Sequence, residues 1–199
     1  MLLMGMAAKG QPPQPGQPNE LPHAESAPPL TVHEKFNYRI VETFGARGYV
    51  GAAVSAAIGQ AENTPGEWGQ GVQGYATRYV SGFGGTLTRE SMAFVMDTAF
   101  HEDSRYFPSK QRGFKTRSWN ALKQTFVCKT DSGRTELAYS RIFSCVANAQ
   151  LVHAWQPASN GSVTDGVRRA FIQFGSDAGM NLLEEFVPFT RPRSLRNRH

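Results

Sequence analysis

Hydrophobic and polar residues follow a helical period along most of the chain between Thr31 and Phe186. Apolar residues recur three and four positions apart, and no alternating run of β-branched residues is long enough to predict a strand. The pattern predicts helices over residues 31–44, 47–60, 64–85, 89–101, 119–128, 136–155 and 163–186. We therefore expect an all-α fold, with six or seven packed helices in a single domain that covers residues 31–190.

Three short motifs predict where helices begin. Thr31-Val-His-Glu34 and Ser162-Val-Thr-Asp165 have the spacing of a capping box, in which a hydroxyl and a carboxyl three residues later bond to exposed backbone N–H groups. Thr64-Pro-Gly-Glu67 has the same spacing with proline at the first helical position, where its missing N–H costs little. We expect a helix to open at each of the three motifs.

Small residues form a stripe on each of two neighbouring predicted helices. The stripes are Gly48, Ala52, Ser55 and Gly59, and Gly74, Thr77, Ser81 and Gly85. Such stripes let two helix backbones approach closely, so they predict a tight antiparallel hairpin about residues 63–66. Glycine inside a helix costs up to about 1 kcal/mol, so the glycines indicate either unusually close packing or a helix break near residues 82–85.

The composition of the chain before and after the helical domain distinguishes three further segments. Residues 1–10 begin with an apolar octet that ends in small residues, like the end of a secretory signal, although the usual basic region is missing and an ordinary terminus stays the alternative. Residues 11–30 hold seven of the twelve prolines and are predicted to be a disordered linker. Residues 191–199 form an arginine-rich tail. We expect export to the periplasm or cell envelope, with no transmembrane helix.

The folded part has a nearly ordinary hydrophobic content, enough to bury a core, and contains two cysteines. If the segments around residues 131–134 form a helical hairpin, Cys128 and Cys145 lie about 13 Å apart along its axis. A disulfide tolerates at most about 7 Å between Cα atoms. We expect two free, buried thiols.

The most unusual charge pattern lies between Ser104 and Thr130, where the chain has seven basic residues, five aromatic residues and no acidic residue. Such a segment attracts an anionic partner. The residues expected to bind an anionic surface are Arg105, Lys110, Arg112, Lys115, Arg117, Trp119 and Lys123. The alternatives are the solvated face of a helix and a nucleic-acid surface, and nucleic acid becomes unlikely if the protein is exported.

Two polar clusters are candidates for chemistry. One is His101, Glu102 and Asp103, and the other is Asp177, Asn181 and Glu185, which recur every four residues on one helical face. We favour a buried network of ion pairs, with Arg78, Arg105 and Arg141 as the expected donors. A metal or acid/base site is the alternative, but the spacing of helical metal ligands is missing, so we predict no catalytic residue, no metal and no cofactor.

Four stretches together carry a family resemblance. They are Tyr75-Ala-Thr-Arg-Tyr79, His101-Glu-Asp-Ser-Arg-Tyr-Phe107, Lys129-Thr-Asp-Ser-Gly133 and Asp177-x3-Asn181-x3-Glu185-Phe-x-Pro188. In this order they resemble a family of uncharacterised exported bacterial proteins. Ser104 stands where the relatives have proline, and Val187 where they have tryptophan. The resemblance implies export and a helical fold and supplies no activity.

These observations favour a non-enzymatic protein of the cell envelope that contacts an anionic membrane surface through its basic and aromatic segment. Two other hypotheses stay open. The protein is a scaffold or packing subunit whose small-residue faces dock on a protein partner, or it is an envelope enzyme that uses the His, Glu and Asp cluster.

Overall fold

The computed structural model describes residues 28–157, 159 and 162–187. The elements are α1 (Val32–Phe44), α2 (Ala46–Ala61), η1 (Gly66–Trp68), α3 (Gly71–Ala99), β1 (Glu102–Asp103), α4 (Phe114–Phe126), β2 (Val127–Thr130), β3 (Thr135–Leu137), α5 (Tyr139–Leu151), η2 (Val152–Ala154) and α6 (Val163–Phe186). Packed helices dominate, and the predicted all-α class is confirmed. The signal remnant predicted for residues 1–10, residues 11–27 of the predicted linker and the arginine-rich tail lie outside the described residues.

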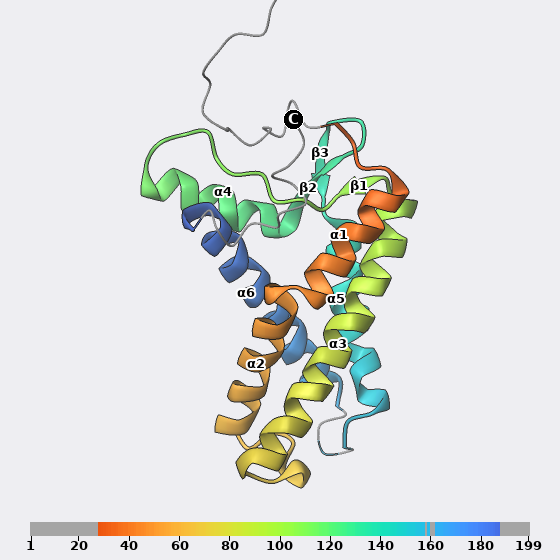
Figure 1. Ribbon diagram of the computed structural model, residues 1–199, viewed down its shortest axis with the longest axis vertical. Helices are drawn as coiled ribbons and strands as arrows, with labels where there is room; N and C mark the ends of the chain where they lie inside the picture. The colour runs from red at the N-terminus through yellow and green to blue at the C-terminus, as the bar shows by residue number, and fades with distance from the viewer. Residues whose placement is uncertain (1–27, 158, 160–161, 188–199) are drawn as a thin grey trace, which may run out of the picture.

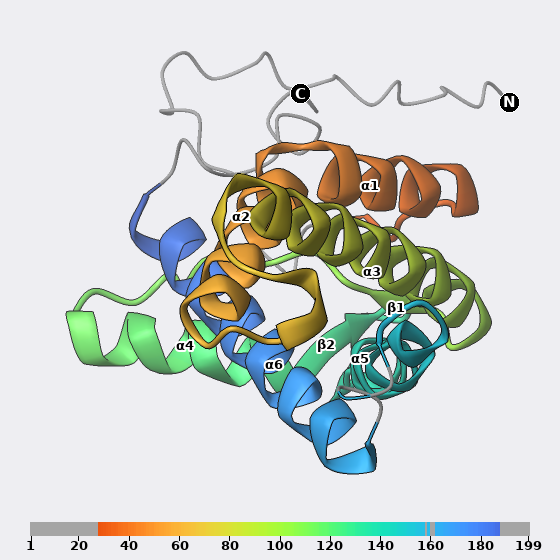
Figure 2. The same ribbon diagram turned by 90° about the horizontal axis from the view of Figure 1, so that it is seen from below.

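The helices form an elongated bundle with α4 and the small sheet at one end (Figure 1). The long helix α3 packs against α1, α2 and α5, and α6 packs against α4 and α5. The turn between α2 and α3 lies at the end of the bundle opposite the sheet (Figure 1). Seen from that end, α2, α3, α5 and α6 lie around one common interior (Figure 2). The bundle therefore has a sheet end and a turn end.

Two of the three predicted helix starts are confirmed. Capping boxes at Thr31 and Ser162 open α1 and α6. The third prediction is wrong, because residues 64–67 lead into the short turn η1 and α3 begins only at Gly71. Arg78 explains the difference, since its guanidinium donates hydrogen bonds to the carbonyls of Thr64, Pro65 and Gly69 and so holds this stretch as a loop.

The tight hairpin of α2 and α3 is confirmed, and α3 runs without a break through residues 82–85. A Cβ atom at Gly82 would lie 3.7 Å from the Cα of Ala52 and from the hydroxyl of Ser55. At Gly85 it would lie 3.4 Å from the side chain of Val152. The helix break is therefore absent, and a Cβ atom at Gly82 or Gly85 would make only ordinary van der Waals contacts.

The structure adds a small sheet, for which the sequence shows no alternating run. Three short strands form an antiparallel sheet in the order β1-β2-β3, with Glu102 opposite Thr130 and Cys128 opposite Glu136. Residues 131–134 form the turn of a β-hairpin, in which Gly133 has a φ of 81°. Strands of two to four residues are too short to show a period of two in the sequence.

The prediction of two free, buried thiols is confirmed, although the helical hairpin that supported it is absent. Cys128 lies on β2 and Cys145 on α5. Burial, followed by the nearby Glu102 carboxylate, raises the pKa of Cys128 well above its ordinary value. Burial raises the pKa of Cys145 to about 11. Neither thiol is poised to react as a nucleophile.

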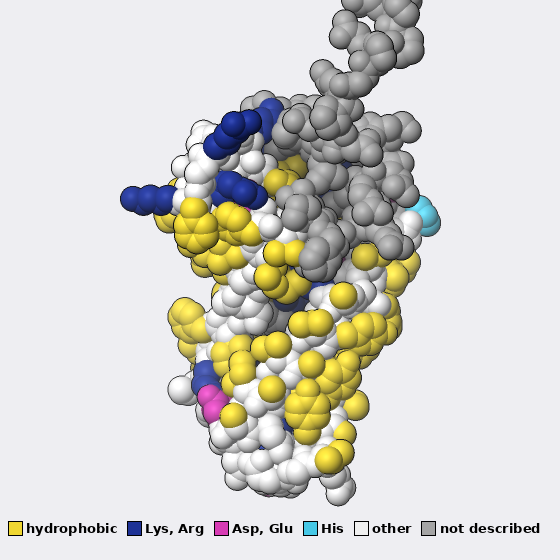
Figure 3. Space-filling model, turned by 60° about the vertical axis from the view of Figure 1, so that its left-hand side comes forward, with side chains coloured by type: hydrophobic (Ala, Val, Ile, Leu, Met, Phe, Trp, Pro, Cys, Tyr) yellow, Lys and Arg dark blue, Asp and Glu magenta, His cyan; other side chains and the backbone are white. Residues whose placement is uncertain are grey.

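The interior of the bundle is polar, and its outer surface is largely apolar. The bulkiest fully buried side chains are Glu102, Glu185, Thr125, Asp97, Cys145, Ser140 and Ser144. Most of the buried apolar residues are alanines. On the face in Figure 3, hydrophobic side chains cover much of the bundle, and most of the visible Lys and Arg gather at one end. The hydrophobic residues therefore do not form the ordinary core that their number in the sequence predicts, because the large ones point outward.

In the described part of the chain, no helix has both the length and the hydropathy that crossing a membrane requires.

Candidate functional site

The predicted cluster of His101, Glu102 and Asp103 has a different environment at each residue. The His101 side chain is 78% exposed, with Nδ1 3.5 Å from a carboxylate oxygen of Asp131. Glu102 is buried and accepts hydrogen bonds from the backbone N–H and the hydroxyl of Ser140, at 3.2 and 2.7 Å. Asp103 is buried against the guanidinium of Arg105, 2.9 Å from its Nε. Because each side chain has separate partners, the three do not form one acid/base site.

Asp177 and Asn181 of the α6 stripe are buried and hold α6 against its neighbours. Arg89 of α3 pairs with Asp177 at 2.8 Å. The Asn181 amide lies 3.3 Å from both the backbone carbonyl of Ala121 and the hydroxyl of Thr125 on α4, and donates to them. The predicted buried network is thus present at these two positions.

Glu185, the third residue of the stripe, is fully buried at the end of α6. Its carboxylate accepts hydrogen bonds from the hydroxyl of Tyr106, from the backbone N–H of Ser109 at 3.1 Å and from Nε of Arg117 at 2.7 Å. Burial and the hydrogen bond to Glu185 raise the pKa of Tyr106 well above its ordinary value. This carboxylate ties the loop before α4 and α4 itself to the end of α6.

The prediction of Arg78, Arg105 and Arg141 as donors to the stripe is wrong. Arg78 is occupied by backbone carbonyls of the η1 turn, and Arg105 is paired with Asp103. Arg141 donates to backbone carbonyls, including that of Thr125 at 3.2 Å. These arginines close loops and helix ends, which a helical-face argument does not anticipate.

A second buried network, between α1 and α3, is missing from the sequence predictions. Arg39 donates to Glu90 at 2.6 Å and to Asp97 at 2.5 to 2.9 Å, and the hydroxyl of Ser104 donates to Asp97 at 2.7 Å. Burial alone would raise the pKa of Glu90, but Arg39 and Arg89 outweigh it and hold this pKa below its ordinary value. The sequence carries a signal for this network, because Lys35 and Arg39 share one face of a short helix whose other face is apolar.

These buried charges form ion pairs and hydrogen-bonded pairs. Within residues 28–157, 159 and 162–187, no group of three or more His, Cys, Asp or Glu side chains is arranged to hold a metal ion. Each fully or nearly fully buried carboxylate described above, at Glu90, Asp97, Glu102, Asp103, Asp177 and Glu185, has an arginine or hydroxyl partner.

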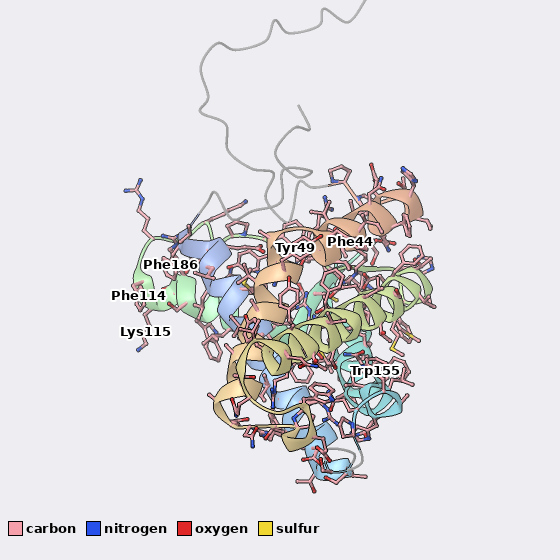
Figure 4. The ribbon with its side chains drawn as sticks, turned by 60° about the horizontal axis from the view of Figure 1, so that its bottom comes forward. Phe44, Tyr49, Phe114, Lys115, Trp155 and Phe186 are labelled. Carbon is pink, nitrogen blue, oxygen red and sulfur yellow. The ribbon has the colours of Figure 1, made fainter. Side chains whose placement is uncertain are left out.

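The basic segment divides into an inward part and an outward part. Lys110, Arg112, Lys115, Lys123 and Trp119 are exposed on the loop before α4 and on α4 itself. Figure 4 shows Lys115 pointing away from the bundle, while the neighbouring Phe114 lies beside Phe186 of α6. The rings of Phe114 and Phe186 are stacked, with centroids 5.2 Å apart. The aromatic contact packs α4 against α6, and the exposed Lys and Arg side chains face outward.

Two predicted surface residues do not belong to this exposed set. Arg105 is 8% exposed and pairs with Asp103, so the prediction that it binds an external anion is wrong. Arg117 is bound to Glu185, and its guanidinium lies over the ring of Phe186 at 4.6 Å. For Arg117, whose side chain is 32% exposed, binding to an anionic surface stays a prediction.

A groove of about 430 Å³ lies between the loop that precedes α4, α4 itself and β2. Lys110, Lys123, Lys129 and Trp119 line it, and no Asp or Glu does. Among the described residues, Glu34, Asp131 and Glu136 are partly exposed acids at this end. Asp131 pairs with Lys35, Glu136 pairs with Arg134, and Glu34 accepts a hydrogen bond from the backbone N–H of Thr31. The groove is therefore a cationic recess with an aromatic wall.

Comparisons with models of known protein families, with curated proteins and with solved structures found no match for this chain.

Proposed function

We propose that the protein is a non-enzymatic helical protein of the cell envelope that binds an anionic membrane surface through its sheet end. The observation that carries the proposal is the charge of that end. Among the residues that the structure describes there, the five exposed charged ones are Lys110, Arg112, Lys115, Lys123 and Arg134, and all five are basic. An end with this charge is attracted to anionic headgroups.

Exposed rings beside these cations suit a lipid interface better than open water. Phe114 is 76% exposed, Trp119 67% and Phe126 51%. Tryptophan is enriched at the level of lipid headgroups, where its ring and its N–H each find a suitable environment. Lys110 and Lys123 line the groove beside Trp119, so one headgroup phosphate can lie near two ammonium groups and an indole ring.

The test is flotation of the full chain with vesicles of neutral lipid or with vesicles that contain anionic lipid. We expect at least about tenfold stronger binding to the anionic vesicles, since each basic residue near such a surface contributes about 1 kcal/mol. The variant Lys110→Gln, Arg112→Gln, Lys115→Gln, Lys123→Gln should lose this preference and keep its helical circular dichroism. An unchanged preference in the variant would refute the proposal.

A matched pair of single substitutions controls for net charge. Lys115→Gln removes one exposed cation from the sheet end, and Arg168→Gln removes one from the turn end. We expect the first to weaken anionic binding and the second to leave it nearly unchanged. Equal effects would mean that net charge and not the sheet end attracts the membrane.

A further inference from the structure

The sides of the bundle lack exposed charge. Only eight of the described Asp, Glu, Lys and Arg residues are exposed, and none of the eight lies on α1, α2, α3 or α5. Five are the basic residues of the sheet end. The other three, Glu62, Glu67 and Arg168, lie near the turn end, where Arg168 pairs with Glu62. The exposed charges therefore lie toward the two ends, and the sides between them carry none.

Large apolar side chains occupy these uncharged sides on every long helix. We call this surface the apolar perimeter, and its most exposed members are Val32, Val50, Val72, Val80, Val95, Phe143, Val163 and Phe171. They are between 51% and 87% exposed and belong to α1, α2, α3, α5 and α6. A monomeric water-soluble protein rarely exposes so extended an apolar surface.

The distribution of the perimeter indicates what covers it. A protein partner generally leaves the rest of the surface charged, because it docks on one patch of limited area. Here the apolar residues lie on five helices that face different directions in Figures 1 and 2. Lipid acyl chains can cover all of these faces at once.

The interior meets part of what an apolar environment demands of a protein, although buried polar atoms such as Nε of Arg89 and Oδ1 of Asn148 have no hydrogen-bond partner. In hydrocarbon, every backbone polar group needs an internal partner and every charge needs a counterion. Arg39, Arg89 and Arg117 each pair with buried carboxylates, and α2 packs on α3 through small residues, as helices do in lipid. The buried charges lower the mean hydropathy of each helix. The apolar character is therefore visible on the outward faces and not in the average over the whole helix.

Tryptophans mark both ends of the perimeter. Trp119 lies on α4 at the sheet end, whereas Trp155 follows η2, toward the turn end. Trp155 donates a hydrogen bond from its indole N–H to Ser81 at 3.1 Å. Tryptophan at each boundary of an apolar zone is typical of proteins embedded in lipid.

We propose that the apolar perimeter lies among lipid acyl chains, so that the bundle is embedded in the membrane and does not rest on it. This inference deepens the proposed function and rests on it for orientation, since the basic sheet end then lies at the anionic headgroups. The ligand is the hydrocarbon of the bilayer, and the bound surface is the whole perimeter.

Depth-dependent quenching of tryptophan fluorescence tests the embedding. The full chain, with its three native tryptophans replaced by Phe, receives one tryptophan at Val80 on α3 or at Phe143 on α5, 70% and 51% exposed. Each variant is reconstituted by detergent removal into neutral vesicles whose acyl chains carry bromine either deep or near the headgroup. We expect both tryptophans to lose more fluorescence to deep bromine than to shallow bromine. A protein that keeps only Trp119 should show the opposite order.

The outcomes separate the embedding from the proposed function. Quenching of both perimeter tryptophans supports the embedding, whatever the flotation experiment shows about anionic lipid. If the full chain floats with anionic vesicles and neither tryptophan is quenched, the surface binding stands and the embedding is refuted. Quenching at only one position, or a cross-linked oligomer with both positions shielded from bromine, would mean that protein covers the perimeter and would also refute the embedding.

Discussion

At the scale of single residues, charge lies inside and most large apolar side chains lie outside. A buried ion pair adds little to stability compared with apolar residues of the same shape, but removal of one partner leaves a buried charge without compensation. The networks around Asp97, Asp177 and Glu185 therefore act mainly as constraints that fix which helices meet.

Arg39→Ala tests the network between α1 and α3. The substitution leaves Asp97 buried without an arginine and Glu90 with only Arg89, 3.7 Å away, so we expect the free energy of unfolding to fall by about 3 to 5 kcal/mol. Denaturant titration of the full chain in mild detergent measures it. The exposed Arg112→Ala is the control, with an expected change within about 0.5 kcal/mol. A loss at Arg39 no larger than at Arg112 would contradict the network.

The lowered pKa of Glu90 predicts how stability depends on pH. Because the pKa in the folded state lies below the ordinary value of 4.5, the carboxylate stabilises the fold above pH 4.5, and this contribution is lost as pH falls through the lower folded value. We expect the free energy of unfolding to decrease as the pH falls below 4.5, and to decrease less steeply in the variant Glu90→Gln. Equal slopes for the two proteins would show that Glu90 is not the titrating group.

The buried thiols give a simple chemical test. Cys145 is fully buried with its pKa raised to about 11, and Cys128 is 8% exposed. Mass spectrometry after treatment with iodoacetamide at mildly alkaline pH should show little modification of the folded protein and two modified cysteines after denaturation. Rapid modification of either thiol in the folded protein would contradict its burial.

At the scale of elements, the α2–α3 hairpin depends on where each glycine lies. A Cβ atom at Gly59 would approach the carbonyl oxygen of Thr64 to 2.9 Å and the side chain of Arg78 to 3.1 Å. At Gly84, on the same hairpin, it would meet nothing within 4 Å. Glycine is thus needed for close approach at the first position and not at the second.

A pair of alanine substitutions measures this difference. Gly84→Ala should raise the free energy of unfolding by up to about 1 kcal/mol, because alanine is the better helix former. Gly59→Ala should lower it by about 1 to 3 kcal/mol, because the added methyl group forces the η1 turn and Arg78 to move. Thermal or denaturant unfolding of both variants measures the two changes in the free energy of unfolding. If both changes had the same sign, tight packing at Gly59 would be contradicted.

The sequence predicts the helices better than it predicts the surroundings of their side chains. Local signals such as the capping boxes at Thr31 and Ser162 identify α1 and α6, and the small-residue stripes identify the hairpin. The helix break near Gly82, one of two alternatives left open by the sequence, is absent because tertiary packing overrides the weak helix propensity of glycine. The short strands escape prediction, since pairing partners such as Glu102 and Thr130 are far apart in the sequence.

The candidate sites were predicted only in part, for a related reason. Periodicity shows that Asp177, Asn181 and Glu185 share a face, but it does not show that this face points inward or that Arg89 and Arg117 pair with it. Composition shows a basic segment, but it does not separate the buried Arg105 from the exposed Lys115. Amphipathic helices have the same period whether the charged face or the apolar face is buried.

At the scale of the whole molecule, three features have one explanation. The interior is polar and paired, the sides are apolar, and the sheet end is basic. A bundle embedded in lipid, with its basic end at anionic headgroups, accounts for all three.

Extraction of the membrane-bound protein tests this account most directly. The full chain is reconstituted into vesicles, washed with high salt and then with alkaline carbonate, and the lipid and soluble fractions are compared. The account predicts that the protein stays with the lipid through both washes, because acyl chains cover its perimeter. Release of a folded, monomeric protein into the soluble fraction by salt alone would contradict it.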